Sequence, residues 1–398
     1  MKAKQRTLSA IILLAAFAVS ATSSTIASTD SDSVDALVEG NRAFAVKMYQ
    51  ELVEGGDNLF FSPYSISSAL GMTYAGAREN TAKEMAAALD FELTQQELHP
   101  AFKKLNQELM TAAGKTDQKL SIANGLCLTG GDLSKDFKAL LKNNYDAEFF
   151  SGGLDKINGW VKQKTEGKIE KILEQLDPNS VCVLLNAIYF KGTWKSQFKK
   201  DYTHEAPFKV SLTKEVQVPL MYQRGMYRLL SKETFQAATM PYKGESLSMV
   251  VLLPRDVDGL EAFEKELTAE RLTGWLEELD KQHVQEIELL MPKFTLEIGV
   301  DLAGPCKDMG MKDAFEKTAN FTGMGYPGKL WISQIKHKAF VDVNEEGTEA
   351  AAVTAVEMTN ESVRSYPVFR ADHPFLFLIR DNQRNSILFM GRMVDPSR

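Results

Sequence analysis

The stretch EEGTEAAAVTAVEM, residues 345–358, follows a two-residue repeat rather than a helical one. Alanine favours helices, but the threonine and valine residues between the alanines favour strands. From Thr348 to Met358 the even-numbered positions carry no charge, and both glutamates, Glu349 and Glu357, fall on odd-numbered positions. Alternate residues of a strand face opposite sides of a sheet. The pattern therefore predicts that a segment with the composition of a surface loop can be buried as a strand.

The composition is that of an ordinary soluble globular protein. The chain has 398 residues, of which 44% are hydrophobic and 25% are charged. Its formal net charge is −7, and removal of residues 1–27 takes away three basic and no acidic residues, which makes the charge −10. An acidic chain is a poor ligand for nucleic acids and heparin. We therefore expect no nucleic-acid partner and no activation by heparin.

The first 27 residues have the pattern of a secretory signal peptide. Three basic residues within the first six positions precede an apolar run over residues 8–19, and small residues precede candidate cleavage sites after Ala21 and Ala27. The apolar run is too short to span a membrane, and no other run approaches that length. We expect a secreted protein, extracellular or, in a bacterium, periplasmic. Residues 28–35 are expected to form a disordered tail, because they are rich in serine and aspartate and contain a single apolar residue, Val34.

The rest of the chain, residues 36–398, is expected to form one domain, since no linker or repeat interrupts it. The chain has only three cysteines, Cys127, Cys182 and Cys306. A small, odd number of cysteines does not indicate a disulfide framework, so stability must come from a large core. Helical spacing and buried-strand patterns alternate, which predicts an α+β fold. Helices are expected over 34–54, 134–146, 154–173 and 257–278, and strands over 181–190, 246–254, 330–343 and 386–394.

The sequence contains no convincing enzyme motif. The chain has no GxSxG, HExxH or paired CxxC sequence, so nothing indicates a nucleophile elbow or a metal site. Residues 323–328 match GxGxxG, but Pro327 lies inside the match and a strand pattern follows it, which favours a turn. We expect no enzyme activity, no metal and no cofactor.

Several segments together resemble the serpins, the serine protease inhibitor superfamily. These segments are NLFFSPYSISSALGMTYAGARENTAKEM (58–85), INGWVKQKTEGKIEKIL (157–173), LLNAIYFKGTW (184–194), HKAFVDVNEEGTEAAA (337–352), FRADHPFLFLI (369–379) and FMGRMVDP (389–396). The resemblance covers roughly residues 36–398. It implies the serpin fold, with about nine helices around three β-sheets and an exposed reactive-centre loop over about 345–368.

The resemblance also implies a mechanism and the residues that serve it. A protease would cleave the loop, and the cleaved loop would enter the main sheet as a strand. Small residues at the inward positions would let it slide between packed strands, and Gly347 would give the hinge its backbone freedom. The implied hinge residues are Glu345, Gly347, Thr348, Glu349, Ala350, Ala351 and Ala352. The polar residues implied at the points where the sheet opens, called the shutter and the breach, are Ser62, Ser65, Asn186, His337 and Trp194.

The function implied is irreversible, suicide-substrate inhibition of serine proteases through a covalent acyl complex. The alternatives are a non-inhibitory serpin that acts as a carrier, chaperone or storage protein, and inhibition of cysteine proteases. The hinge favours inhibition, because no charged or bulky residue stands at an inward position. A monomer that is liable to polymerise is expected, since loop insertion between molecules would use the same sheet.

The sequence leaves the scissile bond open between two main positions and, with less support, other bonds such as the one after Met358. In inhibitory serpins the hinge glutamate usually lies seventeen positions before the bond, and counting from Glu345 gives Glu361–Ser362. Arg364–Ser365 lies three positions further on and suits a trypsin-like protease, whose pocket carries a carboxylate.

Overall fold

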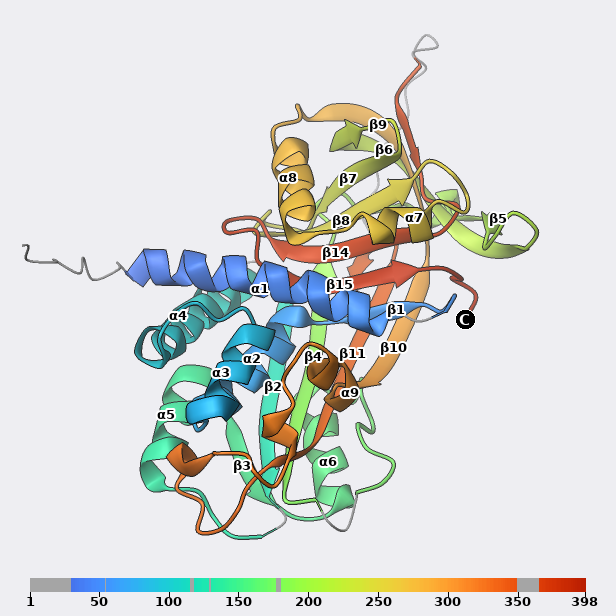
Figure 1. Ribbon diagram of the computed structural model, residues 1–398. Helices are drawn as coiled ribbons and strands as arrows, with labels where there is room; N and C mark the ends of the chain where they lie inside the picture. Colours follow the sequence, from blue (N-terminus) through green and yellow to red (C-terminus); the bar gives the residue numbers. More distant parts are fainter. Residues whose placement is uncertain (1–29, 54, 115–117, 129, 177–179, 349–364) are drawn as a thin grey trace, which may run out of the picture.

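A computed structural model describes residues 30–53, 55–114, 118–128, 130–176, 180–348 and 365–398 (Figure 1). The architecture is an α+β fold, as the sequence predicted, with helices packed around two sets of paired strands. Five of the described helices, α1 to α5, precede most of the strands and gather on one side of the main sheet (Figure 1). The described α-helices are α1 (Asp30–Leu52), α2 (Pro63–Tyr74), α3 (Glu79–Ala88), α4 (Gln95–Gly114), α5 (Lys135–Tyr145), α6 (Leu154–Lys164), α7 (Leu260–Lys265), α8 (Ala269–Asp280) and α9 (Ala303–Asp308).

The main sheet has the strand order β10-β11-β12-β4-β2-β3. Its strands are β2 (Lys119–Leu128), β3 (Glu148–Ser151), β4 (Cys182–Thr193), β10 (Phe294–Asp301), β11 (Ile332–Asn344) and the two-residue β12 (Gly347–Thr348). In β4 every residue from Cys182 to Phe190 is buried, as the apolar sequence on both faces predicted. The helix α2, buried along its whole length, packs beneath β4 and β2.

The other strands form one continuous set with the order β1-β15-β14-β8-β7-β6-β9-β13, and β5 pairs with β6. They are β1 (Leu59–Phe61), β5 (His204–Lys209), β6 (Glu215–Ser231), β7 (Phe235–Pro241), β8 (Leu247–Pro254), β9 (Gln285–Pro292), β13 (Val368–Arg370), β14 (Phe375–Asp381) and β15 (Ile387–Met393). The long β6 pairs with β5 and β9 first and with β7 at its end. It therefore joins the second and third sheets that the family resemblance implies.

Helix α6 lies across the outer face of the main sheet, and its packing explains Gly125 of β2. A Cβ atom at Gly125 would lie 2.8 Å from the ring of Trp160 in α6. The Trp160 indole also donates a hydrogen bond to Glu148 of β3 (2.7 Å). A strand that enters the sheet must therefore do so beneath an attached helix.

Three expectations about element boundaries need correction. The helix expected over 154–173 ends at Lys164, because Glu166 and Gly167 adopt positive φ angles of 53° and 80°. The helix expected over 257–278 is two helices, and Thr268 caps the second by accepting a hydrogen bond from the Arg271 backbone N–H. Residues 30–35 of the expected disordered tail form the first turns of α1, where Asp35 pairs with Arg384 and Val34 is buried.

The three cysteines are free thiols, and all three are buried. Cys127 packs with Ile157 beneath α6, whereas Cys182 packs with the core on the opposite face of the sheet. Among the described residues, no helix combines the length and the apolarity needed to cross a membrane.

Candidate functional site

The main sheet is divided at one end by β12. Gly347 and Thr348 pair in antiparallel fashion with Asn344 and Val343 of β11 on one side, and with Thr193 and Gly192 of β4 on the other. Below β12 the strands β11 and β4 pair directly and in parallel. The sheet is thus open at the end where the loop begins and closed along the rest of its length.

The open and closed parts of the sheet share one register. In the closed part His337 of β11 lies opposite Asn186 of β4. The residues of β11 and β4 that flank β12 have the same alignment, since Thr348 lies between Val343 and Gly192. An extension of β12 would therefore meet both neighbours without any slip of either strand. In that register residue 350 would lie between Val341 and Phe190, and residue 354 between His337 and Asn186.

Gly347 is required by close packing at the head of the opening. Its φ is 150°, and a Cβ atom would lie 2.1 Å from the carbonyl oxygen of Gly192. The next residue, Thr348, is 0% exposed, and its hydroxyl lies 2.9 Å from the Tyr242 hydroxyl. The alternating pattern of residues 348–358 predicted that Thr348 could be buried, and Thr348 already lies in the sheet.

Trp194 fixes the geometry of this end, the breach. Its indole stacks on the Tyr242 ring at a centroid distance of 4.6 Å, and its Nε1–H donates to the carbonyl oxygen of Asn344 (3.0 Å). Its backbone N–H donates to the carbonyl oxygen of Glu346 (3.1 Å). The breach therefore joins β4, the end of β11 and the start of β12 through one aromatic pair.

Two glutamates anchor the turn between β11 and β12. The Glu345 carboxylate accepts from the Thr203 hydroxyl (2.9 Å) and from the Lys293 ammonium (3.1 Å), and Glu346 accepts from Lys200 (2.8 Å). Burial opposes ionisation of Glu345, but its own backbone N–H, Thr203 and Lys293 together hold its pKa below the usual value. These contacts hold the turn in place at the point where the chain enters β12.

A row of polar side chains crosses the underside of the closed part, the shutter. The His337 Nδ1 lies 2.6 Å from the Asn186 Oδ1, and the Asn186 amide donates to Asn124 Oδ1 (2.8 Å) and to Ser65. Asn124 in turn donates to Ser68 (3.2 Å). Because His337, Asn186 and Asn124 are direct cross-strand neighbours, the row joins β11, β4 and β2.

The hydrogen bonds define the protonation state of His337. The Ser62 backbone N–H donates to Nε2 (3.1 Å), so Nε2 is unprotonated and Nδ1–H donates to Asn186. Burial lowers the pKa of His337 to about 3, which keeps the ring neutral. Ser62 also caps α2, since its hydroxyl accepts from the Ser65 backbone N–H. The shutter is therefore a satisfied network of uncharged groups.

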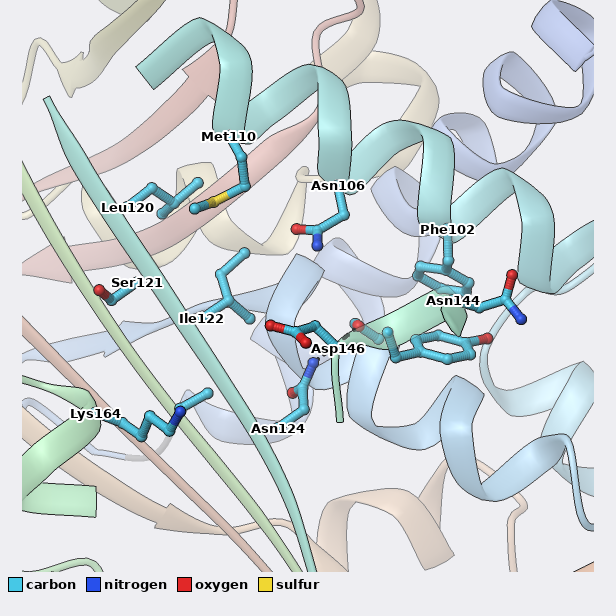
Figure 2. A pocket seen from close by; sticks show the side chains of 13 residues that line it. Phe102, Asn106, Met110, Leu120, Ser121, Ile122, Asn124, Asn144, Asp146 and Lys164 are labelled. Carbon is cyan, nitrogen blue, oxygen red and sulfur yellow. Dashed lines mark hydrogen bonds between the residues drawn. The ribbon is translucent and has the colours of Figure 1, made fainter. Parts of the chain in front are cut away.

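The polar row ends beside a cavity of about 270 Å³ between β2, α4 and α5. Figure 2 shows Asn124 and Ile122 of β2 facing Phe102 and Asn106 of α4 across it. The cavity reaches Asn124 and Ser68, the last two members of the row.

The structure joins Ser62, Ser65, Asn186 and His337 in the shutter network and places Trp194 separately, at the breach. It also places Glu345, Gly347 and Thr348 at the opening. The remaining hinge positions, Glu349, Ala350, Ala351 and Ala352, lie outside the described residues, as do Glu361, Ser362 and Arg364; Ser365 lies just before β13.

Apart from Glu346, which lies between two predicted hinge residues, six residues of the site were not predicted from the sequence. These are Asn124, Ser68, Tyr242, Lys200, Thr203 and Lys293. Only Asn124 carried a signal, because it is a lone amide within the strand-like sequence LSIANGLCL. The other five have ordinary local sequences, and only the fold brings them to the hinge or to the shutter.

Comparisons with known proteins agree with this geometry. The family model for serpins, described as serine protease inhibitors, matches residues 39–396. The chain is 40% identical over 385 residues to Serpin B6 of Pongo abelii and 37% identical over 385 residues to the leukocyte elastase inhibitor of Sus scrofa. Each alignment covers 91% of this chain and 100% of the relative.

A solved structure with the same fold is human thyroxine-binding globulin in complex with its hormone. It superposes with a TM-score of 0.85 at 30% identity, over 92% of this chain and 99% of the globulin. The matched sequence, the split main sheet and the shutter lead to one conclusion: this chain belongs to the serpin (serine protease inhibitor) family.

Proposed function

We propose that the protein is an irreversible, suicide-substrate inhibitor of serine proteases. The observation that carries the proposal is β12, which occupies the gap between β11 and β4 in the register that further insertion needs. A carrier with the same fold does not need a loop patterned for burial. Here the uncharged even-numbered positions would be the ones that enter the core.

The reaction begins as ordinary proteolysis. The protease serine attacks the carbonyl carbon of the scissile residue and forms an ester, and the amine of the following residue leaves as a new N-terminus. The freed loop then extends β12 between β11 and β4. The protein makes no catalytic contribution to this step, since the protease supplies the nucleophile and the base.

Insertion exchanges one set of shutter contacts for another. Strands that now pair directly, about 4.8 Å apart, would move to about twice that separation. The 2.6 Å contact between His337 and Asn186 would break. In the shared register Thr354 arrives between these two side chains, and its hydroxyl can accept from one and donate to the other. The buried polar groups therefore keep hydrogen-bond partners in both states.

The distance covered explains how the acyl-enzyme would be trapped. Fourteen inserted residues at about 3.3 Å each span roughly 46 Å. A domain of this size has a diameter of roughly 54 Å. A protease bound at the cut end would be carried nearly the length of the molecule, and the pull would distort its active site before the ester is hydrolysed.

A protease panel tests the inhibitory function. The protein is mixed with trypsin-like, elastase-like and glutamate-specific serine proteases, and with a papain-like cysteine protease. An SDS-resistant complex with a serine protease supports the proposal, whereas quantitative cleavage without any complex contradicts it. Mass spectrometry of the released C-terminal fragment identifies the bond: a start at Ser362 supports Glu361–Ser362, and a start at Ser365 supports the alternative.

We also propose that the protein is exported and that the complex forms outside the cell. The support is the basic start and the short apolar run of the first 27 residues. The test is N-terminal sequencing of protein recovered from the medium or the periplasm. A mature start after Ala21 or Ala27 agrees with the proposal, and retention of Met1 in the cytosol contradicts it.

A further inference from the structure

A surface beside the exit of the loop exposes apolar side chains within a charged setting. Met226 of β6 is 59% exposed and Val368 of β13 is 44% exposed. Met226 lies opposite Glu286, Arg224 opposite Glu288, and Glu288 opposite Val368, so these side chains share one face of the sheet. We call this surface the exit face; its residues are Arg224, Met226, Glu286, Glu288, Tyr366 and Val368.

The exit face is held in place by its own contacts. The Arg224 guanidinium lies over the Tyr366 ring, 4.9 Å from the centroid, and its Nε lies 3.0 Å from a Glu286 carboxylate oxygen. The Glu288 backbone N–H donates to the Pro367 carbonyl oxygen (2.9 Å). The segment that leads out of the loop is therefore held against β9 and β6 before β13 begins.

The face is continuous with the place where a protease must act. From Ser362 to Val368 the chain can span at most about 20 Å. A protease domain of about 220 residues has a diameter of about 44 Å. A protease that attacks either candidate bond is therefore wide enough to contact the exit face as well as the loop.

The charges of the face indicate what kind of protease fits it. Arg224 forms an ion pair with Glu286, while Glu288, which lies opposite Arg224, is within ion-pair distance of no basic side chain that the structure describes. The face thus offers two exposed apolar side chains beside an unneutralised carboxylate. Its complement is a surface with an apolar side chain flanked by lysine or arginine.

We propose that the exit face is a second recognition surface, which selects target proteases whose active-site rim is basic. The proposal rests on the proposed function only in that a protease must attack the loop. The face acts during encounter, so it changes the rate of loop attack and leaves the later competition between insertion and hydrolysis unchanged.

The test uses two trypsins with the same arginine specificity and opposite net charge, bovine cationic trypsin and an anionic trypsin. Glu361→Arg is introduced into the full-length chain so that both enzymes find an arginine at the expected bond. The second-order rate of loop attack is measured as complex plus cleaved chain. In this background Met226→Ala and Glu288→Gln are compared with Leu212→Ala, which truncates a 71% exposed side chain in the turn between β5 and β6.

We expect Met226→Ala to slow attack by cationic trypsin about fivefold, the effect of losing a moderate interface contact. Glu288→Gln should slow cationic but not anionic trypsin at low salt, and the difference should vanish in about 0.5 M salt. Leu212→Ala should change neither rate, and the ratio of complex to cleaved chain should stay constant.

The proposal is overturned if both exit-face variants are attacked at rates within twofold of the Glu361→Arg background. It is also overturned if Leu212→Ala lowers the attack rate as much as they do. If the chain is cleaved without forming any complex, the inhibitory function fails. The attack rates still decide the role of the exit face in that case.

Discussion

His337→Ala should weaken the closed sheet where a strand has to enter. The imidazole makes two buried hydrogen bonds, one accepted from the Ser62 backbone N–H and one donated to Asn186 Oδ1. His337 belongs to β11, and Asn186 lies opposite it in β4. The substitution therefore removes the side-chain bond between the two strands that must separate.

The expected magnitude follows from the groups left unpaired. Ser62 and Asn186 are both buried, so each loses a partner that water does not readily replace. An unsatisfied buried group costs about 1–3 kcal/mol, which gives a total of about 2–6 kcal/mol. That is a large share of a typical free energy of unfolding of about 5–15 kcal/mol. We expect a lower melting temperature and faster polymerisation on mild heating.

His99→Ala is the matched control. His99 in α4 is also a buried histidine, and its Nδ1 lies 2.6 Å from the Tyr145 hydroxyl, but it does not bridge β11 and β4. Both variants should melt earlier than the wild type in circular dichroism. On native gels after incubation below the melting point, only His337→Ala should polymerise faster than its loss of stability explains. Equal polymerisation rates of the two variants at matched distance below their melting temperatures would refute the role assigned to the shutter.

Three further predictions concern insertion and pH. Ala350→Arg should convert inhibition into simple cleavage, because the register would place residue 350 between the buried side chains of Val341 and Phe190. Residue 349 would face outward, so the Glu349→Arg variant should still form the covalent complex. Equal stoichiometry of inhibition in the two variants would contradict the register. Cleavage within 353–364 should raise the melting temperature of the wild type by more than ten degrees, because a strand is added to the sheet, and an unchanged melting temperature would count against insertion. Burial lowers the pKa of His337 to about 3 and that of His99 to about 4. Below pH 6.5 the unfolded chain binds a proton at each histidine and the folded chain does not. The free energy of unfolding therefore falls by about 1.4 kcal/mol per pH unit for each histidine as the pH falls towards these values, and the full stability is present above pH 6.5. Unfolding by urea at pH 7.5 and pH 5 should show this loss, and the pH dependence should be smaller in His337→Ala; an identical slope in that variant would show that His337 is not the titrating group.

Much of the secondary structure could be predicted from local sequence. The apolar runs at 181–190 and 246–254 lie in the buried strands β4 and β8, and the helix expected over 134–146 is α5, with Ser134 as its N-cap. These features depend on spacing and on neighbouring residues, which the sequence displays directly. The parity of residues 348–358 belongs to the same class, since a strand buries every second side chain wherever it lies.

The boundaries that failed were decided by contacts between distant segments. The composition of residues 30–35 indicates disorder, but a buried Val34 and the ion pair of Asp35 with Arg384 hold them in α1. The helix expected to continue beyond Lys164 ends in a turn, after which Ile169 and Leu173 pack directly on the sheet. In both places packing outweighed local preference.

The functional site divides in the same way. The sequence by itself determined that one face of the loop is free of charge, and that a glycine precedes it. Only the tertiary structure decided that Gly347 stands against Gly192, that Tyr242 meets Thr348, and that β11 and β4 share the register of β12. The physical reason is that burial preference is a property of each residue and its near neighbours. A place to insert exists only where two strands, far apart in the sequence, are aligned to receive a third.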